Sequence, residues 1–507
     1  MLTVTEGQEC DWGNMPLDEL AFGNAMDCDF TLRCYKKMRP MLKNNGSNKL
    51  YDKLLKRVLI LISKVEGRGI RVDQDLLSEL DVALIKEITS LKEVLLEKCP
   101  VKDPDLNLNS DLQMAGVLFT SDGFDLTPTM FTDKTHVPKL SEEHLIKVKV
   151  KCGDKDAVEF IDLLLKYKYR AKQHKTYIGG IRAALKYNGD GRVYSSYNFG
   201  LTVTGRLSCS TYSAGKDKKK GISFHTLARP VKDDPINIRK LMVADKGKVF
   251  LTADFSQAEL RMLAQCCRDK NLMDAFNRGE DLHKFTASMV FDKPIDDITD
   301  EERQIAKSVS FLIVYGGGPF KLSEQIGKSK QYCIGIFNAY EKNFPKIFTW
   351  IKKVHKDVKA DLYAESPFGR RRHLKNVKSP NKKYMYRALR QGMNSIIQSS
   401  ASDLMLHAIL RLQYLIDKTG VSAEILATVH DSVELQCDVG DLDKVLQVLQ
   451  YSLTSTEDFK VFYGLDFVVP FEVDIEVGHS FGDGVGVKFS PKGKVKNLNE
   501  LHEYLES

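Results

Sequence analysis

The sequence lacks the features that mark membrane, secreted and disulfide-stabilised proteins. Its longest purely aliphatic run, residues 58–62, is far too short to cross a bilayer. No basic-then-apolar leader opens it, so we expect neither secretion nor organelle import. Ten cysteines are scattered over 507 residues without a Cys-x-x-Cys pair, which disfavours a disulfide scaffold or a zinc ribbon. We therefore expect reduced thiols and a cytoplasmic protein.

Internal repeats and low-complexity tracts are also missing. With 43% hydrophobic and 28% charged residues, the composition excludes a wholly disordered chain, a collagen and a coiled-coil rod. The length predicts several subdomains. The net charge of +7 is unevenly distributed, because residues 1–34 hold seven acidic residues and one basic residue. The rest of the chain carries 13 more basic than acidic residues, which suits a polyanionic partner.

Hydrophobic periodicity divides the chain into helical and strand-rich regions. Residues 50–185 and 258–415 follow helical periodicity. Two apolar, β-branched runs, Val249–Ala253 and Ile425–Val429, predict buried strands on either side of the second helical block. We therefore expect an α+β protein, in which a helical subdomain leans over a sheet.

Each predicted strand is followed closely by an aspartate, Asp254 after the first and Asp431 after the second. A lone ionised carboxylate is costly at the end of a buried strand, and two of them together repel each other unless a divalent cation lies between them. Two Mg²⁺ ions held by aspartates are the usual device for phosphoryl or nucleotidyl transfer. The alternative is that these residues are helix N-caps or strand-end turns, which is the commoner arrangement for an isolated aspartate.

A second pattern lies in the helical block. Arg303, Lys307, Phe311 and Tyr315 recur every four residues and form one slowly rotating stripe on a helix. Two cations followed by two aromatics suit a triphosphate followed by a sugar and base. The alternative is a solvated basic helix with two half-buried aromatics. Packing against the core is predicted for the opposite face, which contains Ile305, Val309, Leu312 and Ile313.

Six motifs then identify a family resemblance. They are Thr204-Gly205-Arg206-Leu207-Ser208, Asp254 to Arg261 (DFSQAELR), Asp281-Leu282-His283, Arg303 to Gly316 (RxxxKxxxFxxxYG), Gly369-Arg370-Arg371 with Arg390, Asn394 and Gln398, and His430-Asp431. In this order they resemble the motifs of the family A DNA polymerases, the class of bacterial DNA polymerase I and many bacteriophage replicases.

The resemblance implies a right-hand polymerase fold, with an antiparallel palm sheet, helical fingers and a helical thumb. The expected parts are an acidic segment at 1–45, the thumb at 46–190, the first part of the palm at 191–262, the fingers at 263–400 and the second part of the palm at 401–507. The implied activity is template-directed addition of dNTPs to a primer 3′-end with release of pyrophosphate. The implied role is phage genome replication within the host cytoplasm. The implied partners are primer–template DNA, dNTPs, and a separate exonuclease chain or processivity factor.

The resemblance also implies roles for individual residues. Asp254, Asp431 and the backbone carbonyl of Phe255 would hold two Mg²⁺ ions, and Lys307 would act with the two aspartates in catalysis by donating a proton to pyrophosphate. The implied dNTP-binding residues are Gln257, Glu259, His283, Arg303, Lys307, Phe311 and Tyr315. The implied primer–template residues are Arg206, Arg390, Asn394, Gln398 and His430.

Three segments depart from the family pattern. Ser432 stands where the family has a glutamate after His-Asp, and Glu434, on the same strand face, is the candidate substitute. Residues 223–227 replace a family segment that contacts the template, so those contacts cannot be carried over. The run Lys216-Asp217-Lys218-Lys219-Lys220 is either a phosphate-contacting loop or, more commonly for such runs, a solvated one.

Residues 17–35 resemble the last helix of the family's 3′–5′ exonuclease domain, with Asp27 as a metal ligand and Gly23 where a tyrosine is expected. The alternative is an acidic amphipathic helix. In either case we expect that this chain alone does not proofread, because one carboxylate cannot hold two metal ions. The exonuclease would then be lost, or lie on a separate chain that docks on residues 1–45.

Two other functions compete with a DNA polymerase. A single-subunit RNA polymerase shares the palm and the paired aspartates, but Glu259 resembles the carboxylate that excludes a 2′-hydroxyl in the DNA polymerases. A non-catalytic primer–template binding subunit would not require Asp254, Asp431 and Lys307, and all three are present.

Overall fold

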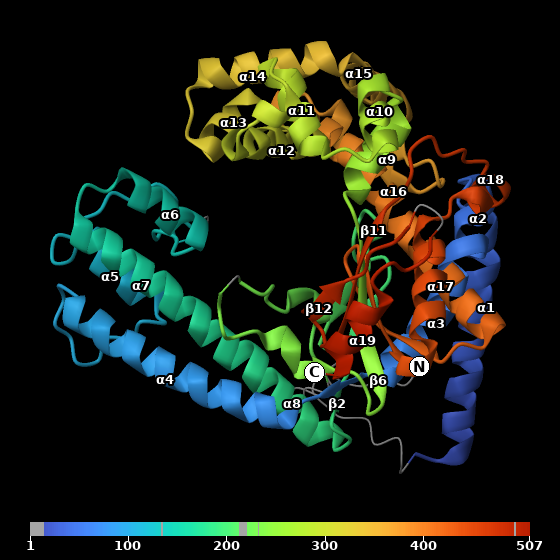
Figure 1. Cartoon of the computed structure of the whole chain (residues 1–507), viewed down its shortest axis with the longest axis horizontal. Helices are drawn as coiled ribbons and strands as arrows, with labels where there is room; N and C mark the ends of the chain where they lie inside the picture. Colours follow the sequence, from blue (N-terminus) through green and yellow to red (C-terminus); the bar gives the residue numbers. More distant parts are fainter. Residues whose placement is uncertain (1–14, 133–134, 212–220, 232, 491–492, 507) are drawn as a thin grey trace.

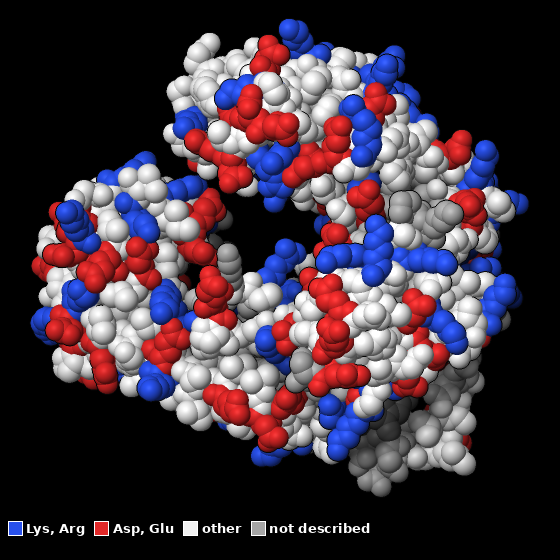
Figure 2. All heavy atoms as spheres, in the orientation of Figure 1, with Lys and Arg blue, Asp and Glu red and all other residues white. Residues whose placement is uncertain are grey.

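The computed structural model describes residues 15–132, 135–211, 221–231, 233–490 and 493–506. An arm of long helices and a helical lobe stand on a central body, and an opening lies between them (Figure 1, Figure 2). Within the described ranges, no helix has the length and apolar character needed to span a bilayer. The predicted basic loop at Lys216–Lys220 and residues 1–14 of the predicted acidic segment lie outside the described residues.

The central body contains an eight-stranded sheet in which every paired neighbour is antiparallel. The strand order is β2-β1-β5-β11-β6-β10-β9, and β12 pairs with β11. This arrangement confirms the predicted α+β class and both predicted strands, which are β6 and β9. The strands are β1 (Ile70–Val72), β2 (Arg192–Val193), β5 (Met242–Val243), β6 (Lys248–Phe255), β9 (Ala423–Val429), β10 (Ser432–Asp438), β11 (Val473–Ser480) and β12 (Asp483–Gly486).

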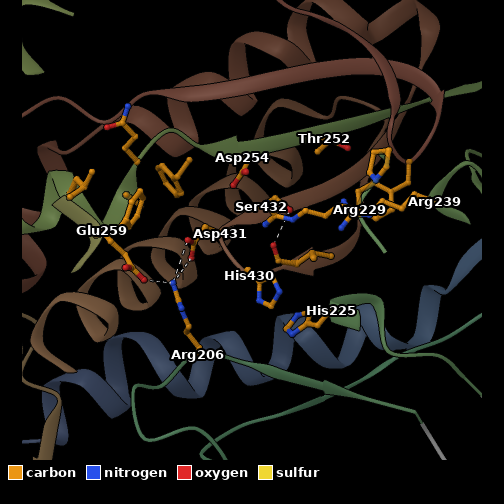
Figure 3. Close-up of a pocket in the computed structure, with 18 of the residues that line it drawn as sticks. Arg206, His225, Arg229, Arg239, Thr252, Asp254, Glu259, His430, Asp431 and Ser432 are labelled. Atoms are coloured by element: carbon orange, nitrogen blue, oxygen red, sulfur yellow. Dashed lines mark hydrogen bonds and ion pairs between the residues drawn. The ribbon is translucent and has the colours of Figure 1, made fainter. Parts of the chain in front are cut away.

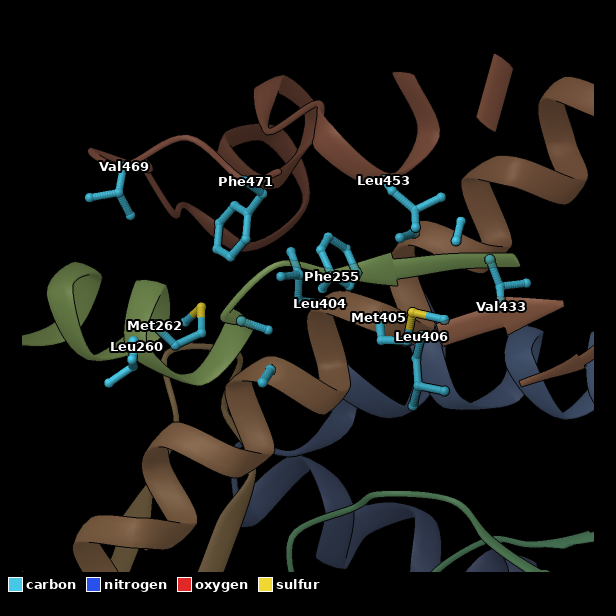
Figure 4. Packing of buried hydrophobic residues seen from close by; sticks show 14 of the residues in the cluster. Phe255, Leu260, Met262, Leu404, Met405, Leu406, Val433, Leu453, Val469 and Phe471 are labelled. Carbon is cyan, nitrogen blue, oxygen red and sulfur yellow. The ribbon is translucent and has the colours of Figure 1, made fainter. Parts of the chain in front are cut away.

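The side chains of β6 alternate between two environments. Leu251, Ala253 and Phe255 belong to the main hydrophobic core. Figure 4 shows Phe255 among the residues of this core. Thr252 and Asp254 point to the other face and line a cavity there. Burial of one strand face therefore fixes which way the aspartate points. The helices that contribute to this core include α3 (Lys56–Arg68), α9 (Ala258–Cys267), α16 (Lys382–Thr419), α17 (Leu442–Thr454) and α18 (Glu457–Tyr463).

Residues 50–185 are mostly helical, as the sequence predicts, but a short strand interrupts them. Ile70–Val72 forms β1 and pairs with β2 and β5, which lie more than 100 residues later in the chain. Gly69 ends α3 with φ +62°, and the chain then turns into the strand. The helical prediction is wrong here because the pairing partners are distant in sequence. The other helices of this region are α2 (Asn48–Leu50), α4 (Gln74–Lys98), α5 (Asp111–Phe119), α6 (Glu142–Lys151), α7 (Lys155–Lys172) and α8 (Gly179–Asn188).

The predicted helical block forms the lobe and the long α16, which joins the lobe to the body (Figure 1). A capping box between Thr299 and Glu302 fixes the start of its central helix, α12 (Asp300–Val314). The other helices are α10 (Lys270–Arg278), α11 (Leu282–Phe291), α13 (Pro319–Ile326), α14 (Lys330–Asn343) and α15 (Pro345–Asp361). β3 (Ser196–Asn198) pairs with β4 (Ser208–Ser210) in one hairpin, and β7 (Tyr363–Glu365) pairs with β8 (Arg371–His373) in another. The helices nearest the two ends of the chain are α1 (Leu17–Asn44) and α19 (Leu498–Glu506).

Candidate active site

The sheet brings the two predicted aspartates together. Asp254 lies opposite Ser432 in the pairing of β6 with β10, and Asp431 is in the two-residue turn between β9 and β10. The backbone N–H of Phe255 donates to the carbonyl of Asp431 over 3.2 Å. Their side chains line the same cavity (Figure 3). Asp431 therefore does lie in a strand-end turn, as the alternative interpretation has it, and this turn brings it to the same cavity as Asp254.

Tight turns place both carboxylates. His430, which precedes Asp431, has φ +59°, and Gln257, three residues after Asp254, has φ +55°. A side chain other than glycine adopts this left-handed conformation at a cost of about 1–3 kcal/mol, so the surrounding structure must enforce it. Such residues cluster at functional sites, and here one lies beside each aspartate.

The cavity has a volume of about 680 Å³ and is strongly charged. Partial desolvation raises the pKa of Asp254 to about 6, and the negative charge of Asp431 adds to the rise. The guanidinium of Arg206 donates to Glu259 over 2.7 Å and lies 3.4 Å from Asp431. Arg206 therefore bridges two acidic residues of the cavity, one of which is a predicted metal ligand.

These residues fit a divalent cation. Desolvation, with the nearby charge of Asp431, raises the pKa of Asp254, so a bound cation would stabilise the ionised form of Asp254. Carboxylate oxygens are the ligands that Mg²⁺ prefers. A cation between the two aspartates would supply the missing positive charge.

The predicted stripe lies on α12, and Tyr315 caps its end. Its opposite face is buried as predicted, since Ile305, Val309, Leu312 and Ile313 are all in the core. Phe311 and Tyr315 line the cavity, whereas Arg303 and Lys307 lie one to three helical turns further out. Arg303 forms an ion pair with Asp281, which caps α11. The helix therefore leads from the cavity to a cationic outer end.

His283 faces this helix from α11, and its ring centroid lies 6.1 Å from that of Phe311. Burial lowers the pKa of His283 to about 4, and the charges of Lys307 and Arg303 also act to lower it. The imidazole is therefore neutral at neutral pH. Its Nδ1 is buried and has no hydrogen-bond partner among the described residues.

The hydroxyl of Tyr315 joins α12 to two other predicted residues. It interacts with the carboxylate of Glu259 and with the amide of Gln398 on α16. Burial raises the pKa of Glu259, and Arg206 partly offsets that rise. Gly316 follows with φ +67°, and a Cβ there would lie 2.7 Å from Cγ of Arg390. Only glycine therefore allows α16 to pack so closely against the end of α12.

Among the predicted site residues, the cavity is lined by Arg206, Asp254, Phe255, Gln257, Glu259, Phe311, Tyr315, His430 and Asp431. The structure places the others outside its lining, namely His283, Arg303 and Lys307 beside α12, and Arg390, Asn394 and Gln398 on α16.

Sequence reasoning missed four cationic or aromatic residues of the cavity, His225, Arg229, Arg239 and Phe481. The ring of His225 lies 4.8 Å from that of His430, and its Nε2 donates to the carbonyl of Thr428 over 3.0 Å. Burial lowers the pKa of His225 to about 4. His225 lies in the segment that departs from the family pattern, which is the one signal that could have found it.

Glu434 does not serve as a third carboxylate of the cavity. It is 1% exposed and accepts hydrogen bonds from the hydroxyls of Thr252 and Ser432, at 2.6 and 2.7 Å. Ser432 lines the cavity and Glu434 lies behind it. Full burial raises the pKa of Glu434 from 4.5 to about 7.

We expect Glu434→Gln to stabilise the protein in alkaline solution. Because the folded-state pKa is raised, the folded protein holds a proton that the unfolded chain releases between about pH 4.5 and 7, so stability falls as pH rises through this window. Urea unfolding at pH 5 and pH 8 measures the effect, which should appear at pH 8 alone. Glu424→Gln on β9 is the control, and we expect it to lower the urea midpoint at pH 8. Hydrogen bonds from Gln436 and Lys248 lower the pKa of Glu424, so its ionised form stabilises the folded protein. A lower urea midpoint for Glu434→Gln than for the unmodified protein at pH 8 would contradict the assignment.

The N-terminal segment forms a helix, α1, as both of its interpretations require. Asp27 is exposed on this helix. The assignment of Asp27 to an exonuclease remnant stays a prediction.

Comparisons with known proteins show which family the chain and its fold resemble. A family model described as "DNA polymerase family A" matches residues 74–483. DNA polymerase I of Borreliella burgdorferi is 28% identical over 93% of this chain and 48% of its own length. The DNA polymerase of Bacillus phage SP01 is 27% identical over 93% of this chain and 55% of its own length. The chain thus spans about half the length of these curated relatives. Among solved structures, the polymerase domain of Pol1 from M. smegmatis, in complex with DNA primer-template and dNTP, is similar with a TM-score of 0.75 and 27% identity, covering 87% of this chain and 72% of that one.

Proposed function

The chain belongs to DNA polymerase family A, and on this premise we propose that it extends a DNA primer by copying a template, releasing pyrophosphate from each incoming dNTP. The observation that carries the proposal is the convergence of Asp254 and Asp431 in one charged cavity beside Tyr315. The similarity to a polymerase domain bound to primer-template and dNTP supports it.

In this proposal Asp254 and Asp431 hold two Mg²⁺ ions, together with the carbonyl of Phe255. When bound, the ions would activate the primer 3′-hydroxyl and neutralise charge on the leaving pyrophosphate. We expect Arg206 to exchange its contact with Asp431 for a contact with DNA when the cation binds. The reason is that Arg206 and the cation compete for the carboxylate of Asp431.

The incoming dNTP lies along α12 in the same proposal. Its triphosphate meets Lys307, Arg303 and the neutral His283 at the outer end, and its sugar and base meet Phe311 and Tyr315 in the cavity. Lys307 has no carboxylate partner among the described residues and is free to donate a proton to the leaving pyrophosphate. Gln257 and Glu259 border the nucleotide, and Arg206, Arg390, Asn394, Gln398 and His430 contact primer and template.

We propose the following parts for the polymerase. The thumb is residues 46–190, which include the arm built from α4 to α8, whereas α2 and α3 of the same range pack in the central body. The sheet region (191–262 and 401–507) is the palm, and the lobe (263–400) is the fingers. The acidic segment at 1–45 is the docking place for a separate exonuclease chain, and a processivity factor is the alternative partner of the polymerase. The similarity to a phage polymerase supports a role in phage genome replication, and the bacterial relatives support the alternative of a bacterial enzyme.

Primer extension tests the proposal. A labelled primer on a DNA template is incubated with the protein, Mg²⁺ and one dNTP at a time. We expect extension by one residue with the complementary dNTP alone. Failure to extend with every dNTP would overturn the proposal, and extension with rNTPs in preference to dNTPs would favour the RNA polymerase.

We expect Glu259→Ala to raise ribonucleotide incorporation by about tenfold or more relative to dNTP use. Arg206 and Tyr315 hold the carboxylate in the cavity. In this proposal it fills the space that a 2′-hydroxyl would need, and its removal opens that space. The ratio of kcat/KM for rNTP and dNTP measures the effect. Glu259→Gln is the matched control, because it keeps the volume and should keep most of the discrimination. An unchanged ratio in Glu259→Ala would show that another group selects the sugar.

A further inference from the structure

The free end of the arm and the lobe approach each other across the opening. In Figure 1, α6 near the end of the arm lies opposite α13 of the lobe. More than 160 residues separate these two helices in the sequence. The arm, the central body and the lobe together frame the opening (Figure 2).

Each of the two helices presents one acidic and one basic side chain on a single face. On α6 they are Glu143 and Lys147, four residues apart, and on α13 they are Lys321 and Glu324, three residues apart. All four residues are exposed. At 1.5 Å per residue, the rise between the two members is about 6 Å on α6 and about 4.5 Å on α13. The two pairs therefore have similar lengths.

The charges of the two helices act on each other across the gap. The hydrogen bond from Lys147 lowers the pKa of Glu143, and the charge of Lys321 on α13 lowers it further. The same hydrogen bond raises the pKa of Lys147, and the charge of Glu324 adds to the rise. Salt screens exposed charges beyond about 10 Å, so an effect of this kind requires that they lie close together. The order of charges along the two helices is complementary, because Glu143 meets a cation and Lys147 meets an anion.

Exposed apolar side chains accompany these charges. Val150 lies three residues after Lys147 and is 80% exposed, and Phe320 lies four residues before Glu324 and is 62% exposed. These spacings place each apolar residue on the charged face of its own helix. Contact between the two faces would therefore remove apolar surface from water as well as pair the charges.

We propose that α6 docks on α13 when DNA lies in the opening, so that the arm and the lobe together enclose the DNA. The contact pairs Glu143 with Lys321 and Lys147 with Glu324. This inference rests on the proposed function, because it takes primer–template DNA as the occupant of the opening. It gives the chain a further function, which is to slow the release of DNA between successive additions.

Release of a labelled primer–template from the full chain tests this contact. Excess unlabelled DNA is added to the complex without dNTPs, and fluorescence anisotropy measures the dissociation rate. We expect Lys321→Glu to raise this rate by about threefold or more, because the new carboxylate repels Glu143 instead of attracting it. The ratio of the rates for variant and unmodified protein should fall toward one at high salt, since all four charges are exposed.

The charge-reversed variant Glu143→Lys/Lys321→Glu separates docking from a direct contact of Lys321 with DNA. Because it restores an attractive pair across the gap, its dissociation rate should return to within about twofold of that of the unmodified protein. Glu142→Lys/Lys321→Glu is the matched control. It makes the same changes in charge, but Glu142 lies about 100° away from Glu143 around the helix, so the fast release should persist.

An unchanged dissociation rate in Lys321→Glu would overturn the proposal. Fast release that Glu143→Lys does not correct would also overturn it, by showing that Lys321 contacts DNA rather than α6. The urea midpoints of the three variants should match that of the unmodified protein, because the substituted side chains are exposed. Release is measured without dNTPs, so failure of the proposed polymerase activity is separately visible as a lack of primer extension by the unmodified protein.

Discussion

Asp254→Ala and Asp431→Ala should each lower the rate of primer extension by about a thousandfold or more. Each change removes a carboxylate from the pair that converges in the cavity, and with it the positioning and the charge stabilisation of the bound cations. Such losses are worth several kcal/mol of barrier, and each 1.36 kcal/mol is a factor of ten in rate. Single-turnover extension of a labelled primer with Mg²⁺ and dNTPs measures the effect.

Binding of primer–template DNA separates this loss from misfolding. Both variants should bind DNA within a few-fold of the unmodified protein, because they remove negative charge from a surface that meets phosphates. Asp438→Ala is a matched control, since Asp438 is exposed at the other end of β10 and pairs with Lys248 in the sheet. Near-normal extension by either cavity variant, or a comparable loss in Asp438→Ala, would refute the assignment of the metal ligands.

Phe311→Tyr should make the protein sensitive to dideoxy terminators, changing the preference for dNTP over ddNTP by about a hundredfold. Phe311 lines the cavity one helical turn before Tyr315 and offers no hydroxyl. A nucleotide without a 3′-hydroxyl therefore lacks a hydrogen-bonding group that the unmodified pocket cannot replace. In the Phe311→Tyr variant, the tyrosine hydroxyl supplies the missing group. A site that uses such a polar group can discriminate strongly against the analogue that lacks it.

The ratio of incorporation from mixtures of ddNTP and dNTP measures this preference. Phe320→Tyr is the control, because Phe320 is 62% exposed on α13 and does not line the cavity. The unmodified protein should resist the terminator. If it uses both nucleotides equally well, or if the two variants behave alike, Phe311 does not contact the sugar.

Local sequence was sufficient to predict the features that depend only on residues close together along the chain. The stripe on α12 is an example, because helical periodicity fixes which side chains share a face, and burial of Ile305, Val309 and Leu312 then directs Phe311 toward the cavity. The apolar runs of β6 and β9 likewise predicted two buried strands with Asp254 and Asp431 at or just after their ends.

Local sequence was not sufficient where partners meet only in the folded chain. Ile70–Val72 is a strand because β2 and β5 pair with it, and its three residues carry no periodic signal of their own. The same reason explains His225, whose ring reaches His430 across more than 200 residues of sequence.

By itself, the sequence determined the family, the α+β class, the two aspartates and the order of the residues along α12. The tertiary structure alone decided which charges meet. It paired Arg206 with Glu259 and Asp431, buried Glu434 behind Ser432, and brought Gln398 of α16 to Tyr315. The physical reason is that periodicity fixes the direction of a side chain relative to its own helix or strand, whereas the partner it meets and the pKa that results depend on how distant segments pack.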